Sequence, residues 1–319
     1  MNRVLLTGAT GFVGPFLSEL LHRSGYRVVA AVRREGKMPP GVSEAVIVGD
    51  IGAGTNWKAA LVNIDAVIHL AGRAHVFESG AANSDAFMEV NALGTKALAT
   101  ACAAAQVRRF VYLSTVKVNG EETHARPFGP TDDPSPQDAY GVSKLQGEKY
   151  LMAAAEQSKM DVVIVRPPLV YGPGVRANFA QMMRWVHRGW PLPLGAVKNA
   201  RSLVSIWNLT DLLLRVLEHP QAAGRTFMAS DGVDLSTPEL LRLIGRSLGS
   251  PARVFRIPVS TLHLAARVIG AAPQISKLCG SLQVDIAATR QLLEWTPPLS
   301  MEESMARTAA AYLAARTAV

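Results

Sequence analysis

The sequence predicts an α/β fold, a doubly wound parallel sheet joined to a smaller mixed α/β domain. Short, apolar, β-branched segments alternate with helical patterns through the first half of the chain, and this alternation is typical of parallel βαβ units. A glycine-rich turn directly follows the first of these segments. The chain has 319 residues, of which 49% are hydrophobic, so it is long enough to bury one large core or two joined ones.

Six short strands are expected in the first half, at residues 4–7, 27–32, 45–48, 66–70, 110–114 and 162–166. Helical patterns lie between them at about 14–24, 83–105 and 138–157. The proline-rich loop 127–136 precedes the last of these helices, and Asp138 is a candidate for its first residue. After Gly174 the pattern changes to mixed helices and short strands, and it ends with a helix at 301–317.

The turn after the first strand has the sequence Gly8-Ala-Thr-Gly11-Phe12-Val13-Gly14. The first glycine permits a tight turn, the second lets the backbone approach a pyrophosphate, and the third allows close helix packing. Free N–H groups and the dipole at the N-terminus of the next helix favour an anion there. The strand–turn–helix context therefore predicts a Rossmann dinucleotide-binding fold.

This motif sets the domain organisation that we expect. Residues 1–174 with 203–229 are assigned to a dinucleotide-binding Rossmann domain, and residues 175–202 with 230–319 to a substrate-binding domain. Within the returning segment, a strand at 203–206 and a helix at 209–218 are expected to join the first domain.

Tyr140 and Lys144 lie four residues apart in a helical pattern, so both side chains are expected on one face. The lysine charge favours a phenolate and moves the tyrosine pKa, about 10 when free, toward the working range. Thr115 stands 25 residues before Tyr140. Such a pair alone is more often a solvated helix face, but with the glycine turn it predicts a nicotinamide-dependent oxidoreductase with Tyr140 as the acid/base.

The end of the second strand favours one nicotinamide cofactor. Enzymes that use NAD usually carry an acidic residue about 20 residues past the glycine turn, where it bonds the ribose hydroxyls. This chain has Val32, Arg33 and Arg34 there, and arginine would pair with a 2′-phosphate. NADP(H) is therefore the expected cofactor, with NAD(H) as the alternative.

With these motifs in place, the chain resembles the extended short-chain dehydrogenase/reductases that act on nucleotide sugars, the NAD-dependent epimerase/dehydratase family, over nearly its whole length. The resemblance implies a catalytic triad of Thr115, Tyr140 and Lys144. It implies cofactor contacts from Gly8, Gly11, Phe12, Val13, Gly14, Asp50, Ile51, Leu70, Ala71, Gly72, Asn91, Tyr140, Lys144 and Pro167. It implies substrate contacts from Thr115, Lys117, Tyr140, Asn178 and Arg201.

Simpler interpretations stay open for several of these residues. Asp50 could end a strand and begin a turn, and Asn91 could cap a helix. Arg201, whose fork suits a substrate pyrophosphate, could instead pair with a surface carboxylate. Lys117 is equally well a surface lysine. His69 is expected to be packed or solvent-facing, because Tyr140 already fills the acid/base position.

Members of this family that dehydrate sugars resemble Thr-Asp-Glu at the central motif, where this chain has Thr115-Val116-Lys117. Without the two acids, elimination of water is not expected. The stretches 113–121 and 139–148 resemble the bacterial 4-ketoreductases that make UDP-N-acetyl-quinovosamine-type sugars for surface polysaccharides. We therefore predict an NADPH-dependent reductase of a UDP-4-keto-6-deoxy-hexosamine at C4. A UDP-hexose 4-epimerase with tightly bound NAD is the alternative, and a non-catalytic NADP-binding regulator is a remote one.

Charge and composition set the expected partners. The net charge is +8 and the pI about 9.7, but the arginines are scattered without a nucleic-acid-binding motif. Small polyphosphate ligands such as a UDP-sugar are the better match. The resemblance also implies a homodimer, for which the helices at 92–105 and 140–157 are the candidate interface. Packing within the chain explains the apolar faces of these helices equally well.

The two cysteines, Cys102 and Cys279, have no metal-binding spacing, so no metal or disulfide is expected and a reducing cytoplasm fits. No apolar run is long enough to span a bilayer, and the N-terminus does not have the pattern of an export signal. The apolar stretch 261–282 is expected to be a packed helix that Pro273 breaks, rather than a helix on a membrane surface.

Overall fold

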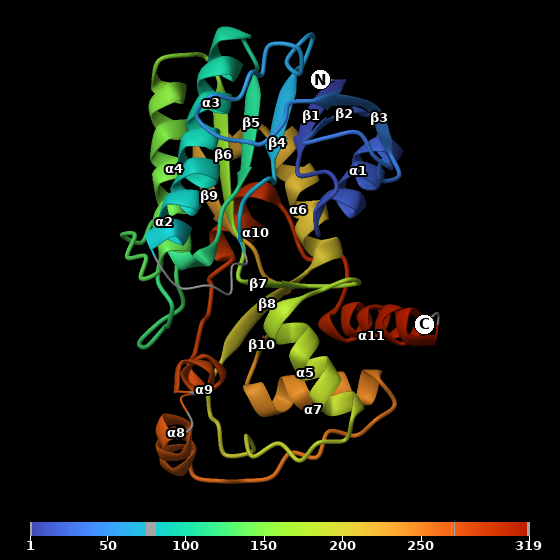
Figure 1. The fold of residues 1–319 in the computed structure, drawn as a ribbon, viewed down its shortest axis with the longest axis vertical. Coiled ribbons are helices and arrows are strands. Elements are labelled where there is room, and N and C mark those ends of the chain that lie inside the picture. The colour runs from blue at the N-terminus through green and yellow to red at the C-terminus, as the bar shows by residue number, and fades with distance from the viewer. Residues whose placement is uncertain (1, 75–80, 269, 271, 318–319) are drawn as a thin grey trace.

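The computed structural model describes residues 2–74, 81–268, 270 and 272–317. A seven-stranded parallel sheet, in the order β3-β2-β1-β4-β5-β6-β9, forms the centre of the upper part of the molecule (Figure 1). Its strands are β1 (Arg3–Thr7), β2 (Arg27–Val32), β3 (Val42–Ile47), β4 (Ala66–His69), β5 (Arg109–Leu113), β6 (Asp161–Arg166) and β9 (Arg225–Met228). The strand order runs outward from β1 and β4 in both directions, so the predicted doubly wound parallel sheet is confirmed.

Helices cover both faces of this sheet (Figure 1). One face holds α1 (Gly14–Arg23), α6 (Ile206–Glu218) and α10 (Ala287–Leu293), and the other holds α2 (Ala81–Phe87), η1 (Met88–Leu93), α3 (Gly94–Ala104) and α4 (Ala139–Glu156). Because both faces are covered, a central strand such as β4 is buried along its whole length. This burial explains why its sequence is a continuous apolar run rather than an alternating one.

Two predicted elements differ from the structure. The helix expected at 83–105 is divided by η1, a π-helical segment whose i→i+5 spacing leaves no mark on the hydrophobic pattern. The strand expected at 45–48 is β3, which begins three residues earlier. β3 is the edge strand and has mostly exposed side chains, so an apolar run could not mark its limits.

A smaller unit lies below the large sheet in Figure 1. It contains a three-stranded sheet of β7 (Leu169–Tyr171), β8 (Arg201–Ser205) and β10 (Asp234–Leu235). Around it lie α5 (Ala177–His187), α7 (Thr237–Ser247), α8 (Val259–Val268), α9 (Ala272–Cys279) and α11 (Met301–Thr317). Its core gathers side chains from β7, α5, α7 and α11, among them Tyr171, Phe179, Leu241 and Met305.

The segment that was expected to return to the first domain does so only in part. Its helix, α6, packs on α1, and β9 pairs with β6. The expected strand 203–206 is β8, which instead pairs in parallel with β7 in the small sheet. The domain limits and the homodimer remain predictions.

The apolar C-terminal segment forms α8 and α9, and Leu264 and Val268 on α8 are exposed. None of the helices in the described part of the chain has the length and apolar character needed to cross a membrane. Cys102 is buried in α3, Cys279 ends α9, and both thiols are free.

Candidate active site

The loops that carry the candidate residues share one edge of the large sheet. Parallel strands bring their carboxyl ends together, and ligands bind there, where the strand order reverses. In this chain the reversal lies between β1 and β4. The glycine turn follows β1, and the segment from Leu70 to Gly72 follows β4.

The glycine turn forms a cradle that a side chain would fill. Gly8 has a φ of +71°, and a Cβ there would lie 2.8 Å from the Ala71 nitrogen. A Cβ on Gly14 would lie 2.3 Å from the carbonyl oxygens of Gly8 and Ala9. The next helix, α1, begins behind Val13, which has no polar side-chain atom to cap it. These features fit the pyrophosphate of a dinucleotide.

Arg33 and Asp50 meet at the same edge. They follow the adjacent strands β2 and β3, and the Arg33 Nε lies 2.7 Å from the Asp50 Oδ1. Both side chains are largely exposed. The structure therefore gives Arg33 a carboxylate partner at the position where the sequence suggested a 2′-phosphate contact.

His69 lies at the buried centre of a chain of hydrogen bonds. The Ala71 N–H donates to the Thr7 Oγ1 at 3.1 Å, and that hydroxyl lies 2.6 Å from the His69 Nδ1. On the other side, the His69 Nε2 lies 3.1 Å from the Thr95 Oγ1, which donates to the Asn91 carbonyl at 2.8 Å. One direction of donation satisfies every member, with the imidazole neutral and protonated on Nε2.

Burial, together with a smaller contribution from the nearby Lys144 charge, lowers the pKa of His69 to about 3, so the ring stays neutral. The expectation of a packed histidine therefore agrees with its place in the structure. Its hydrogen bonds tie the ends of β1 and β4 to Thr95 on α3 and, through Thr95, to η1.

Asn91, on η1, uses its side-chain amide to hold two other segments. Its Oδ1 accepts from the Arg73 N–H at 2.8 Å, and its Nδ2 donates to the Arg73 carbonyl and the Ser143 Oγ, both at 3.0 Å. A Cβ on Gly72 would lie 3.1 Å from the Asn91 Oδ1 and 3.8 Å from the Lys144 Nζ. The Asn91 side chain thus does not cap a helix, and its amide is already bonded to Arg73 and Ser143. We assign Asn91 to holding the loop after β4 against α4.

The three predicted catalytic residues come from two neighbouring elements. Thr115 begins the short turn η2 (Val116–Val118) after β5, while Tyr140 and Lys144 lie one turn apart on α4. The Thr115 hydroxyl faces the Tyr140 phenol and lowers its pKa. The Phe87 ring packs against Tyr140, with the ring centroids 6.0 Å apart.

Burial shifts both titratable groups toward their neutral forms. Burial and, to a smaller extent, the Asp138 carboxylate raise the pKa of Tyr140 to about 12, although the Thr115 hydroxyl acts to lower it. Burial lowers the pKa of Lys144 to about 7, and the Glu148 carboxylate opposes this fall. The Lys144 Nζ also lies 3.9 Å from the centre of the Tyr112 ring. The protein alone thus holds a neutral phenol beside an amine that titrates near neutral pH.

Lys117 lies close to this pair but has partners of its own. Its ammonium bonds the Glu121 carboxylate at 2.7 Å and also the Asp138 carboxylate. Asp138 is the N-cap of α4, as the sequence suggested, and its Oδ1 accepts from the Gly141 N–H at 2.7 Å. The substrate-phosphate contact expected of Lys117 does not fit this arrangement, and we assign the lysine to the two carboxylates instead.

A buried network lies one turn further along α4. Glu148 accepts from the Ser114 hydroxyl at 2.5 Å and from the Arg166 guanidinium at 2.6 and 3.0 Å. Arg166 also donates to the Asn119 Oδ1 at 3.1 Å. All four side chains are buried. The network joins β5, β6, η2 and α4 beneath the catalytic groups.

The two substrate candidates after β7 lie in the small unit. The Arg201 Nη1 donates to the carbonyls of Lys277 and Gly280, at 2.8 and 2.9 Å, at the end of α9. Burial lowers its pKa, and the Glu121 and Glu122 carboxylates oppose the change. The surface-carboxylate interpretation of Arg201 is thus replaced by backbone carbonyls. Asn178 is exposed in the first turn of α5.

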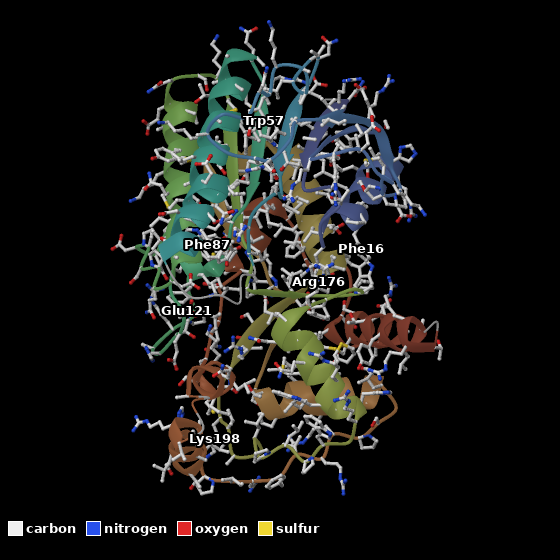
Figure 2. The ribbon with its side chains drawn as sticks, viewed as in Figure 1. Phe16, Trp57, Phe87, Glu121, Arg176 and Lys198 are labelled. Carbon is white, nitrogen blue, oxygen red and sulfur yellow. The ribbon has the colours of Figure 1, made fainter. Side chains whose placement is uncertain are left out.

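Figure 2 shows how the loop after η2 meets the small unit. Phe87 and Glu121 both lie at the lower end of the layer that holds α2 and α4, above α9. The same loop is tied to the small unit by the bond from the Thr123 N–H to the Ser281 carbonyl at 2.8 Å. The loop that carries Glu121 therefore lies close to Arg201, whose pKa the Glu121 and Glu122 carboxylates act to raise.

A family described as "NAD dependent epimerase/dehydratase family" matches residues 4–229. The chain is 43% identical over 316 residues to the UDP-glucose 4-epimerase of Vibrio cholerae, covering 98% of this chain and 96% of that one.

Two crystal structures have the same fold, each with a TM-score of 0.79 and with 98% of this chain and 99% of the other covered. They are the UDP-glucuronic acid 4-epimerase from Bacillus cereus in complex with NAD, at 21% identity, and the UDP-glucose 4-epimerase from Thermotoga maritima with UDP-glucose, at 20%. At these identities the likeness concerns the fold alone.

Proposed function

Because this chain belongs to the NAD dependent epimerase/dehydratase family, we propose that it is a UDP-hexose 4-epimerase that works with tightly held NAD. The observation that carries the proposal is the 43% identity to a UDP-glucose 4-epimerase over 98% of the chain. The arrangement of Thr115, Tyr140 and Lys144 supports it, since these residues supply what reversible oxidation of a sugar alcohol requires.

In this proposal, each residue of the triad acts at the C4 oxygen of the sugar. NAD, when bound, supplies the hydride acceptor and donor. Tyr140 takes the proton from the C4 hydroxyl during oxidation and returns it during reduction. Lys144 holds positive charge near the phenol and thereby offsets the burial that raises the Tyr140 pKa. The Thr115 hydroxyl orients the C4 oxygen beside the phenol.

The cradle of Gly8, Gly11 and Gly14 fits the cofactor pyrophosphate, and we assign Asp50 with Ile51 to the adenine end. Leu70 to Gly72 and Pro167 follow β4 and β6 at the same sheet edge, where they would line the cofactor. Arg33 is bonded to Asp50, whose carboxylate would repel a 2′-phosphate. This pair favours NAD over NADP.

The site lacks acids at the two positions where dehydration would need them. Val116 is buried, and Lys117 is held by two carboxylates. A sugar oxidised at C4 would therefore keep its substituents and be reduced again. The 4-ketoreductase that the sequence suggested first uses the same triad, but the comparisons support it less well than they support the epimerase. The complete triad argues against a non-catalytic regulator.

The first experiment separates these functions on the purified protein. The nucleotide released by acid is identified by mass spectrometry, and UDP-glucose and UDP-N-acetylglucosamine are incubated without added cofactor and followed by NMR. We expect NAD to be released and the C4 epimer of at least one sugar to form. Release of NADP, no epimer, and oxidation of NADPH by UDP-4-keto-6-deoxy-N-acetylglucosamine would overturn the epimerase and establish the reductase.

Tyr140→Phe tests the acid/base assignment. Removing the phenol should lower turnover by about 10²–10⁴-fold, while the amount of NAD that copurifies stays the same. Tyr150→Phe is the matched control, since Tyr150 lies on the same helix and contacts Lys96 rather than the triad. Turnover of Tyr140→Phe at the rate of Tyr150→Phe would exclude the proposed mechanism.

A further inference from the structure

Lys117 connects the two segments that carry Thr115 and Tyr140. Its own backbone N–H donates to the Thr115 Oγ1 at 3.3 Å. Its ammonium reaches across to Asp138, the N-cap of the helix that begins directly before Tyr140. One residue therefore contacts Thr115 through its backbone and the start of α4 through its side chain.

The contact between η2 and α4 leaves little space. A Cβ on Gly141 would lie 2.8 Å from the Lys117 carbonyl oxygen and 3.2 Å from the Asp138 Oδ1. The two carboxylate oxygens of Asp138 have different partners. Its Oδ1 accepts from the Gly141 N–H, and its Oδ2 binds the Lys117 ammonium. Its carboxylate thus both starts the catalytic helix and binds the turn that carries Thr115.

The charge of Asp138 acts against the proposed chemistry. A carboxylate near a phenol disfavours the phenolate, and Asp138 raises the pKa of Tyr140 in this way, in addition to the effect of burial. Lys117 places a positive charge directly on that carboxylate. The same lysine binds Glu121, so the cluster holds one cation and two carboxylates.

Other groups face Tyr140 from the elements packed around it. On the buried side this is Tyr112 on β5, and the side chain packed from α2 is the ring of Phe87. Behind Tyr112, the Lys144 Nζ lies against its ring and Glu148 on α4 acts on both Tyr112 and Lys144. His69 on β4 faces Lys144 and stays neutral. These neighbours are the same whether or not Lys117 carries its charge, so its effect can be isolated.

We propose that Lys117 is a positioning residue for the acid/base chemistry, which neutralises Asp138 and clamps the Thr115 turn to the first turn of the Tyr140 helix. The inference rests on the proposed function, because that function makes Tyr140 the acid/base. The proposal also gives a role to the lysine at the third position of the Thr115-Val116-Lys117 motif, where the family members that dehydrate sugars resemble an acid.

The test compares Lys117→Met, Lys117→Arg, Asp138→Asn and the double variant Lys117→Met/Asp138→Asn. Asparagine keeps an N-cap acceptor for α4. Two quantities are measured in NAD-loaded protein. One is the Tyr140 titration, followed by ¹³Cζ-tyrosine NMR without any sugar and assigned with Tyr140→Phe, and the other is the pH profile of turnover. Arg126→Met is the matched control, because it removes the Arg126–Asp132 pair from the same loop.

Lys117→Met should raise the Tyr140 pKa by about one unit, the effect of one uncompensated nearby charge, and lower turnover at pH 7 by about tenfold. Raising the pH should restore it. In Lys117→Arg and in the double variant, Tyr140 should titrate as in the wild type. Arginine still neutralises the Asp138 charge, and in the double variant that charge has been removed. Asp138→Asn should not raise the pKa.

The proposal would be overturned if the Tyr140 pKa in Lys117→Met equalled that of the wild type. It would also be overturned if the Tyr140 pKa in the double variant equalled that in Lys117→Met. If Lys117 had only a structural role, Tyr140 would titrate in Lys117→Met as in the wild type. The losses of turnover in the two single variants would then add in the double variant. The NMR titration needs no substrate, so failure of the epimerase assay leaves this test intact. Conversely, epimerase activity with an unshifted Tyr140 refutes the role of Lys117 alone.

Discussion

Two arginine–carboxylate pairs flank the same catalytic edge of the sheet in opposite surroundings. Arg166 and Glu148 make a two-pronged pair whose side chains are 6% and 5% exposed. Arg33 and Asp50 make a single contact at 2.7 Å with side chains 75% and 83% exposed. Both pairs join a guanidinium to a carboxylate, so comparing them shows the effect of burial on the strength of the pair.

The buried pair is part of the framework that holds the catalytic helix, and the exposed pair is part of the surface that would meet the cofactor. Glu148 accepts a hydrogen bond from Ser114, and its charge acts to raise the pKa of Lys144. In water, by contrast, an ion pair gains little because both partners are solvated and mobile. Loss of the buried pair should therefore cost much more stability than loss of the exposed one.

Breaking the buried pair should have the largest effect. Arg166→Met leaves the Glu148 charge buried without its partner, and such changes cost about 3–5 kcal/mol of the free energy of unfolding. Urea unfolding measures this loss directly. A loss below about 1 kcal/mol would show that the pair is not the buried anchor inferred from its 5–6% exposure.

His69 tests burial on a group that carries no charge. Its pKa is lowered from 6.5 to about 3 by burial, so between these values the unfolded chain binds a proton that the folded chain does not. Stability from this source is complete above pH 6.5 and falls as the pH drops, by about 1.4 kcal/mol per pH unit.

The wild type should therefore lose about 2 kcal/mol more than His69→Gln between pH 7 and pH 5. Urea unfolding of both proteins at the two pH values gives this difference, in which the contributions of other titrating groups cancel. Equal pH dependence of the two proteins would contradict a neutral, buried His69.

The exposed pair should have the smallest effect. Arg33→Met removes a contact between solvated side chains, and the free energy of unfolding should change by less than about 0.5 kcal/mol. The same urea experiment serves as the control for Arg166→Met. A change as large as that of Arg166→Met would show that burial is not what separates the two pairs.

Much of this arrangement follows from local patterns. The limits of β2 agree with the prediction, and those of β1, β4, β5 and β6 agree within one residue, because these strands are buried on both faces and appear as apolar runs. The i, i+4 spacing brings Tyr140 and Lys144 to one helix face, and Asp138 caps the helix as its residue type predicts. The edge strand β3 and the π-helical segment with Asn91 left no such pattern.

Contacts between distant segments could not be predicted in this way. Lys117 was expected either at the substrate phosphates or at the surface, but its carboxylate partner Asp138 lies 21 residues away in the sequence. Glu148 ends the stretch 139–148 and Arg166 ends an expected strand, and neither had a predicted partner until packing of β6 on α4 joined them. A signal existed for the second pair, since two charged residues in apolar surroundings require partners.

The doubly wound sheet, the glycine cradle and the tyrosine–lysine pair could be predicted from the sequence, because each depends on residues close together in the chain. Which charges are neutralised depends instead on how distant segments pack. The tertiary structure paired Arg33 with Asp50, Lys117 with Asp138 and Arg166 with Glu148, and it placed the Arg201 guanidinium on backbone carbonyls. The physical reason is that an electrostatic interaction depends on distance and burial in space, and neither quantity is written in the order of the residues.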